Sequence, residues 1–192
     1  MLKKAISVTS ALLTLMIIAG AASADAGISA ELRLSPQEIH QKMPVGFGGG
    51  LDFPLIGENT RWGIDAGVQV ITSWEDSLEL LPEDTAQYDI WTKNGTDIFI
   101  ALGPAVSHRF SKGEIGAIPS LGAGTFFAIT AYDETKKSEN PPPLEAVSDS
   151  ETETDFYIRP ALKLYYKKLY LEYEYIGLPE AIDHVISAGI MF

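Results

Sequence analysis

The side chains that could do chemistry in this chain are scattered along it. Its three histidines, His40, His108 and His184, lie far apart in sequence, and none has the spacing of a metal motif such as His-Glu-x-x-His. The acidic stretch 149–155 lacks the Asp-x-Asp-x-Asp-Gly pattern of a calcium loop. The sequence therefore predicts no metal site and no cofactor.

Ser187 and His184 are the one nearby pair that could act as nucleophile and base. Positions 184 and 187 have opposite parity, so in a strand their side chains leave opposite faces. A nucleophile and its base must come within hydrogen-bond reach. We therefore expect no catalytic residues and no enzyme, and a lipid A-modifying enzyme is kept only as a third alternative.

A second group of charged side chains shares one face of the predicted strands. With a two-residue turn at Lys167-Lys168, Lys163 falls opposite Glu172, an oppositely charged cross-strand pair. Because buried charges must be paired, we expect an ionic network inside the fold, with a narrow ion path as the alternative. Its expected members are Glu31, Arg33, Asp65, Arg159, Lys163, Glu172 and Glu174.

The elements that would position these side chains are strands, because apolar residues alternate with others throughout the chain. We predict eight strands, at about 26–34, 45–53, 62–70, 98–106, 115–131, 156–165, 169–175 and 184–192. The connections at 54–61, 107–114 and 167–168 are compact. Those at 75–95 and 133–155 are long and acidic, and those at 35–44 and 176–183 are modest. This alternation predicts an all-β, antiparallel up-and-down barrel with its long loops at one end.

The two faces of the predicted strands favour a transmembrane barrel over a soluble one. One face is large and aliphatic, whereas the other is rich in glycine and charge, as suits a crowded interior. Aromatic residues should form two girdles, with Trp74, Phe156 and Tyr175 at the long-loop end. The girdle at the short-turn end would contain Phe53, Trp62, Phe110, Tyr166 and Phe192. We expect Pro104, Pro119 and Pro160 to lie at bulges or strand ends.

The N-terminus has the pattern of a cleavable signal peptide. Lys3-Lys4 precede an apolar stretch over 5–20, and Ala22-Ser23-Ala24 forms a small-residue cleavage site. We predict a signal peptide at 1–24 and a single domain at 25–192. Removing Lys3 and Lys4 leaves 12 basic and 26 acidic side chains, a net charge of −14. With no evident basic patch, nucleic acid and anionic lipid are not expected partners.

Taken together, these residues resemble the small eight-stranded outer-membrane barrels of the opacity-protein and surface-antigen type. The resemblance covers the predicted mature chain and rests on the signal peptide, the glycine-rich strand 45–51, the segment 159–166 before a tight turn, and the last strand ending in Phe192.

The resemblance implies location in the cell outer membrane, contact with outer-membrane lipid, and recognition of Phe192 by the barrel-assembly machinery. We expect a monomer with a structural or surface-interaction role, in which the loops 75–95 and 133–155 meet an extracellular ligand. A narrow cation-preferring pore is the alternative. The residues do not identify the ligand.

Overall fold

The strands account for nearly all of the structure. The computed structural model describes residues 26–79, 90–137, 145–177 and 184–192, so the predicted signal peptide at 1–24 lies outside the described residues. The strands are β1 (Gly27–Leu34), β2 (Val45–Ile56), β3 (Thr60–Glu79), β4 (Ile90–His108), β5 (Phe110–Lys112), β6 (Ile115–Lys137), β7 (Glu145–Tyr166), β8 (Leu169–Tyr175) and β9 (His184–Met191). In these described parts of the chain, no helix is long and apolar enough to span a bilayer.

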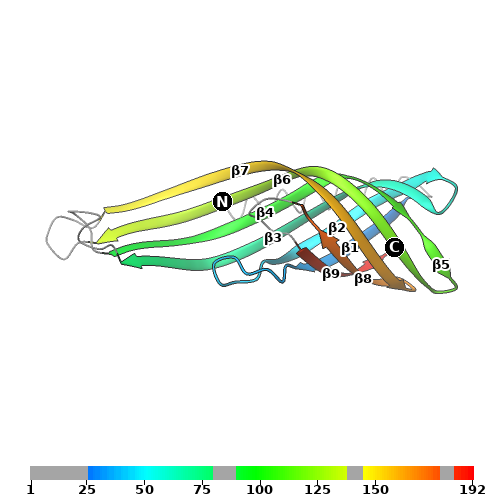
Figure 1. Cartoon of the computed structure of the whole chain (residues 1–192), viewed down its shortest axis with the longest axis horizontal. Helices are drawn as coiled ribbons and strands as arrows, with labels where there is room; N and C mark the ends of the chain where they lie inside the picture. The colour runs from blue at the N-terminus through cyan, green and yellow to red at the C-terminus, as the bar shows by residue number, and fades with distance from the viewer. Residues whose placement is uncertain (1–25, 80–89, 138–144, 178–183) are drawn as a thin grey trace.

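The strands close into a ring of eight. The order is β4-β3-β2-β1-β9-β8-β7-β6, and β6 pairs back onto β4, every pairing being antiparallel. The short strand β5 continues β4, because Ser107↔Ser120 and Phe110↔Ala117 belong to one register along β6. The predicted eight-stranded antiparallel ring is confirmed, with its fourth strand divided in two (Figure 1).

The three strand prolines do not lie at bulges, so that part of the prediction is wrong. Within the described strands, the register shifts fall elsewhere, between Pro54 and Ile56 and between Ile71 and Trp74. Pro104 and Pro119 lie at gaps in the β4–β6 ladder, as expected where a residue has no N–H to donate. Pro160 lies just before Ala161, the residue at which the pairing of β7 with β8 begins. On the β8 side, Pro160 is therefore at the end of a ladder, as predicted.

The faces of the ring have the predicted polarity. Outward side chains such as Leu32 (72% exposed) and Leu169 (62%) are solvent-accessible, while the inward Arg33 and Glu174 are buried at 3% and 0%. Leu51 is an exception, because it shares the outer parity but is buried. This polarity is the reverse of a soluble barrel, in which the apolar face is the covered one.

Four strands continue well beyond the ring. The strands β3, β4, β6 and β7 are 20, 19, 23 and 22 residues long, whereas β8 has only 7 (Figure 1). Residues 71–79, 90–97, 130–137 and 145–155 of these strands form what we call the protruding sheet. The prediction of loops at 75–95 and 133–155 is therefore wrong wherever the structure describes them, while their parts at 80–89 and 138–144 lie outside the described residues. Their Asp and Glu residues are of types that are depleted in strands, but ladder pairing with neighbouring strands satisfies their backbone.

A hydrophobic cluster fills the lumen where the ring meets the protruding sheet. Its members belong to strands on opposite sides of the ring, and their side chains meet inside the lumen. They are Ile71, Trp74, Phe99, Ala101, Phe126, Tyr157, Ile176 and Val185. The expectation that Trp74 belongs to a lipid-facing girdle is wrong, because it is 2% exposed. The register shift between Ile71 and Trp74, with Ser73 at φ 57°, reverses the parity of β3 and turns the indole inward.

Candidate functional site: an ionic lumen and an acidic sheet edge

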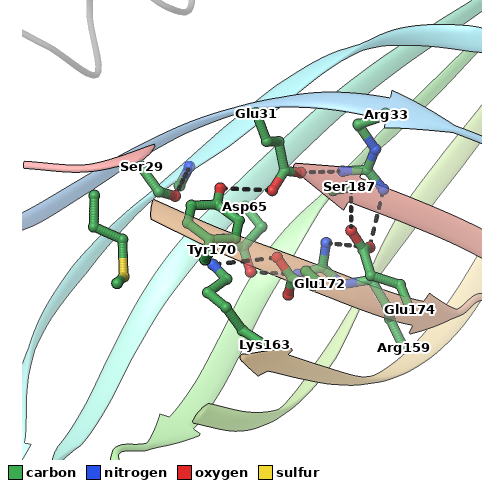
Figure 2. Close-up of polar contacts among 12 residues, drawn as sticks. Ser29, Glu31, Arg33, Asp65, Arg159, Lys163, Tyr170, Glu172, Glu174 and Ser187 are labelled. Atoms are coloured by element: carbon green, nitrogen blue, oxygen red, sulfur yellow. Dashed lines mark hydrogen bonds and ion pairs between the residues drawn. The ribbon is translucent and has the colours of Figure 1, made fainter. Parts of the chain in front are cut away.

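The lumen of the ring contains a connected network of ion pairs, drawn in Figure 2. Arg33 and Arg159, from β1 and β7, both contact Oε2 of Glu174 on β8, at 2.9 and 3.0 Å. Arg33 also pairs with Glu31 at 3.1 Å, and Arg159 pairs with Asp65 on β3. The network thus joins both sides of the barrel through one buried carboxylate.

A further ion pair, between Lys163 and Glu172, lies beside this network. Lys163 Nζ is 3.2 Å from Glu172 Oε2, and the two residues are direct cross-strand partners, as the two-residue turn at Lys167-Lys168 implies. The Lys163 ammonium also lies 4.1 Å from the ring centre of Tyr170. The structure therefore brings all seven residues of the predicted network into the same lumen.

Two further residues contact the network, although the sequence analysis did not assign them to it. The Tyr170 hydroxyl donates to Glu31 at 2.8 Å, and the Ser187 hydroxyl lies 3.5 Å from Glu174 Oε1 (Figure 2). Both have the inward parity of their strands, which was the signal available for them. Ser187 therefore contacts the ion network rather than His184, whose ring contacts Tyr173 with 2.7 Å between Nδ1 and the hydroxyl.

Glycines on β2 and β3 leave room for the guanidinium of Arg33. A Cβ at Gly67 would overlap the Arg33 guanidinium, and a Cβ at Gly48 would crowd both Arg33 and Glu31. Small residues therefore stand where a long cation crosses the interior, which is the role that the sequence analysis gave to the glycine-rich face.

The acids and cations of the network nearly balance. Ligand oxygens of Glu31, Glu172 and Glu174 lie within 4.8 Å of one another, a separation that a metal ion could bridge. Arg33 contacts Glu31 and Glu174, and Lys163 contacts Glu172, so each of these carboxylates already faces a side-chain cation. The arrangement can hold the two walls of the barrel together, and the three carboxylates that could bridge a metal ion are already engaged by side-chain cations.

The lumen is filled at one end and hollow at the other. The hydrophobic cluster occupies the end next to the protruding sheet. A cavity of about 610 Å³ lies at the short-turn end, lined by polar side chains that include Asp52, Arg61, Ser107 and Lys163. Arg61 Nε is 2.6 Å from Asp52 Oδ1, so this cation is also paired. The interior is thus a polar vestibule that stops at an ionic layer and then an apolar one.

The outer part of β7 is an open sheet edge. Its pairing with β8 ends at Ala161, and among the described residues no strand lies on its side away from β6 over 145–157. Acidic residues at 149, 151, 153 and 155 occupy one face, and Ser or Thr at 148, 150, 152 and 154 the other. Asp149 and Asp155 turn back onto the backbone, each accepting a 2.7 Å hydrogen bond from the next N–H, of Ser150 and of Phe156.

The loop between β1 and β2 folds against the protruding sheet. The His40 ring stacks on Trp74 with centroids 4.0 Å apart, and its Nδ1 lies 2.7 Å from Asp76 Oδ2. His40 Nε2 is 3.5 Å from Asp97, a buried carboxylate that has no hydrogen-bond partner among the described residues. Lys42 Nζ donates to the carbonyls of Thr72 and Ser73, at 2.9 and 2.5 Å. Sequence reasoning missed this contact because the turn of β3 at Ser73 creates it.

The last residue closes the ring without burying its side chain. The Phe192 N–H donates to the Ile28 carbonyl at 2.8 Å, and its aromatic side chain is 66% exposed. Nothing in this geometry tests whether assembly machinery reads Phe192, which stays a prediction.

The closed ring, the apolar exterior and the ionic interior define an eight-stranded β-barrel with inverted polarity. No family model matches the chain, and no curated protein sequence matches it. The chain is similar to the structure of Ail, the attachment invasion locus protein of Yersinia pestis, with TM-score 0.44 and 16% identity over 87% of this chain and 97% of that one. It is also similar to Neisserial surface protein A, with TM-score 0.42 and 13% identity over 86% and 95% of the two chains.

A third similar structure is a major outer membrane protein from Thermus thermophilus, with TM-score 0.39 and 10% identity over 87% and 99% of the chains. Each of these similarities extends over most of the chain. At these identities the similarity concerns the fold and does not identify an activity.

Proposed function

We propose that this protein is an outer-membrane β-barrel with a surface-interaction role, exercised by the protruding sheet. Its predicted signal peptide would export it, and the exposed aliphatic exterior suits hydrocarbon. A pore is less well supported, because among the described residues side chains from opposite walls meet in the hydrophobic cluster. A structural anchor that presents an extracellular sheet is the reading that the geometry supports best.

The open edge of β7 is the observation that carries the proposal. In an antiparallel strand the N–H and C=O of one residue point to the same side, and successive residues alternate. The N–H groups of Ser150 and Phe156 donate to the side chains of the residues just before them, Asp149 and Asp155. The Ile158 carbonyl accepts a 3.1 Å hydrogen bond from Gly177 N–H, on the side of β7 away from β6. The even-numbered residues therefore face away from β6. Thr152 and Thr154 lie between them with no described strand opposite.

An extended peptide could add to this edge as a further strand. Backbone hydrogen bonds would give affinity, as in other cases of strand addition, and side chains would give selectivity. The four acidic residues on one face favour a basic partner through charge complementarity. The partner we propose is thus an extended, Lys- or Arg-containing segment of an extracellular protein.

Binding of a short alternating Lys-Thr peptide to the detergent-folded protein tests this proposal. Thr154→Pro removes one edge-facing N–H while leaving the β6 side of the ladder intact, and Thr154→Val is the matched control that keeps the N–H. Loss of one such hydrogen bond should weaken binding about fivefold. A Glu-Thr peptide should not bind.

Equal affinity of the Lys-Thr peptide for the Pro and Val variants would overturn strand addition at β7. Equal binding of the acidic peptide would show that charge complementarity plays no part. Heat-modifiable gel migration of each variant checks separately that the barrel has folded.

A further inference from the structure

Basic side chains from separate parts of the sequence meet at the short-turn end of the barrel. Arg109 follows β4, Lys112 ends β5, and Lys167 and Lys168 form the turn between β7 and β8. Backbone hydrogen bonds hold these segments together. Lys167 N–H donates to the Glu114 carbonyl at 2.7 Å, and Met191 N–H, at the end of β9, donates to the Lys168 carbonyl at 2.8 Å. The chain has a net charge of −12, so a basic cluster is unexpected.

Three of these cations, all but Lys112, border a groove of about 730 Å³ on the rim. Arg109, Lys167 and Lys168 line it together with Tyr165, Tyr166 and Leu169. The one acidic residue in its lining, Glu114, already pairs with Lys167 at 3.6 Å. Arg109 lies 5.2 Å from the Tyr165 ring and contacts Met191, and among the described residues neither it nor Lys168 faces a carboxylate.

The groove continues directly into the apolar exterior of the barrel. Tyr166 and Leu169, which line it, are exposed outward residues at 54% and 62%. A cationic recess beside an aliphatic wall matches a molecule with an anionic head and hydrocarbon chains. Acidic residues cluster instead at the far end, on the protruding sheet, so the charge of the molecule is polarised along its axis.

We infer that the rim groove binds the headgroup of an anionic phospholipid in the membrane leaflet at the short-turn end. Arg109 and Lys168 donate to the phosphodiester, and the acyl chains lie on the wall beside Tyr166 and Leu169. This inference rests on the proposed membrane placement. It also revises the expectation from the sequence that no basic patch is available for anionic lipid, because the patch forms only when the β4–β6 connection and the β7–β8 turn are brought together.

Native mass spectrometry of the protein in mixed micelles tests the inference, with phosphatidylglycerol and phosphatidylcholine of matched chains supplied in equal amounts. The wild-type protein should retain phosphatidylglycerol in preference. The double variant R109Q/K168Q should lose that preference by about fivefold for each cation removed. Lys93→Gln on the protruding sheet is the matched control, since it removes a cation near Tyr132 at the other end and should change nothing.

Unchanged lipid preference in R109Q/K168Q, or an equal loss in Lys93→Gln, would overturn the site. Displacement of phosphatidylglycerol by excess inorganic phosphate would overturn the assignment to a lipid, because the groove would then recognise phosphate alone. Heat-modifiable migration and insertion into vesicles are scored first for each variant. A failure of the barrel in membranes would appear there, and so would be distinguished from loss of headgroup binding.

Discussion

Arg33 and Arg159 contact the same oxygen of Glu174, although they belong to strands that are not neighbours in the ring. The shared carboxylate is fully buried, at 0% side-chain exposure. Two like charges are thus held close by one opposite charge, and Glu31 and Asp65 each pair with one of the two guanidinium groups. The arrangement couples β1, β7 and β8 across the interior rather than along the ladder.

Glu174→Gln should be strongly destabilising, because it leaves two buried guanidinium groups short of a negative partner. Removing one member of a buried ion pair typically costs 3–5 kcal/mol, so we expect a loss of about 4 kcal/mol in the free energy of unfolding. Urea unfolding followed by heat-modifiable migration measures this. The control is Glu114→Gln at the exposed rim, where loss of the pair with Lys167 should cost about 0.5 kcal/mol. Similar losses in both variants would contradict a special role for Glu174.

Lys163 and Glu172 should be energetically coupled, because they are direct cross-strand partners in the lumen. We expect a double-mutant cycle with Lys163→Met and Glu172→Gln to give a coupling energy of about 1–3 kcal/mol. Unfolding midpoints and slopes in urea supply the four free energies. Additive effects of the two substitutions would show that the pair contributes no interaction of its own.

His40→Ala should loosen the β1–β2 loop without unfolding the barrel. It removes the stack on Trp74 and the contacts with Asp76 and Asp97, which we expect to cost about 1 kcal/mol of local stability. Hydrogen exchange should accelerate at the Ser35 and Ile39 N–H groups, which are bonded within this loop at 3.0 Å.

The matched control for this loop is His108→Ala, since His108 lies at the other end of the barrel beside Thr60, with 2.8 Å between Nδ1 and Oγ1. It should leave exchange in the β1–β2 loop unchanged. Equal exchange in wild-type and His40→Ala proteins would show that the stack does not hold the loop.

Tyr132 on the protruding sheet should lose its phenolic proton at a higher pH than an ordinary tyrosine. Its hydrogen bond to Glu151, 2.7 Å long, raises the pKa of the phenol to about 12 from 10.0. A raised pKa in the folded state means that this contribution to stability is complete below pH 10 and is lost as the pH rises toward 12. The near-ultraviolet absorbance difference between wild-type and Tyr132→Phe proteins during alkaline titration gives the pKa. Glu151→Gln should lower it, and an unchanged value in that variant would contradict the assigned cause.

The barrel and its inner network could be predicted because a period of two fixes which face each side chain takes. That argument placed Arg159 and Glu174 on one face, and turn length alone set Lys163 opposite Glu172. It failed at Trp74, where one extra residue in β3 reverses the parity and no residue type marks the change. The sequence predicts a loop over 145–155, as part of 133–155, because the acidic and hydroxyl side chains there carry no alternation of hydrophobicity. Their strand exists through pairing with β6, which a single segment does not reveal.

The backbone contacts of Asp149 and Asp155 bear on crowding at a cell surface. Two copies approaching through β7 would place rows of like charge side by side and would have to break both aspartate contacts before their backbones could pair. The same edge that would admit a basic strand therefore repels its own duplicate. Dense packing of the protein in the membrane plane need not end in fibres or fused sheets.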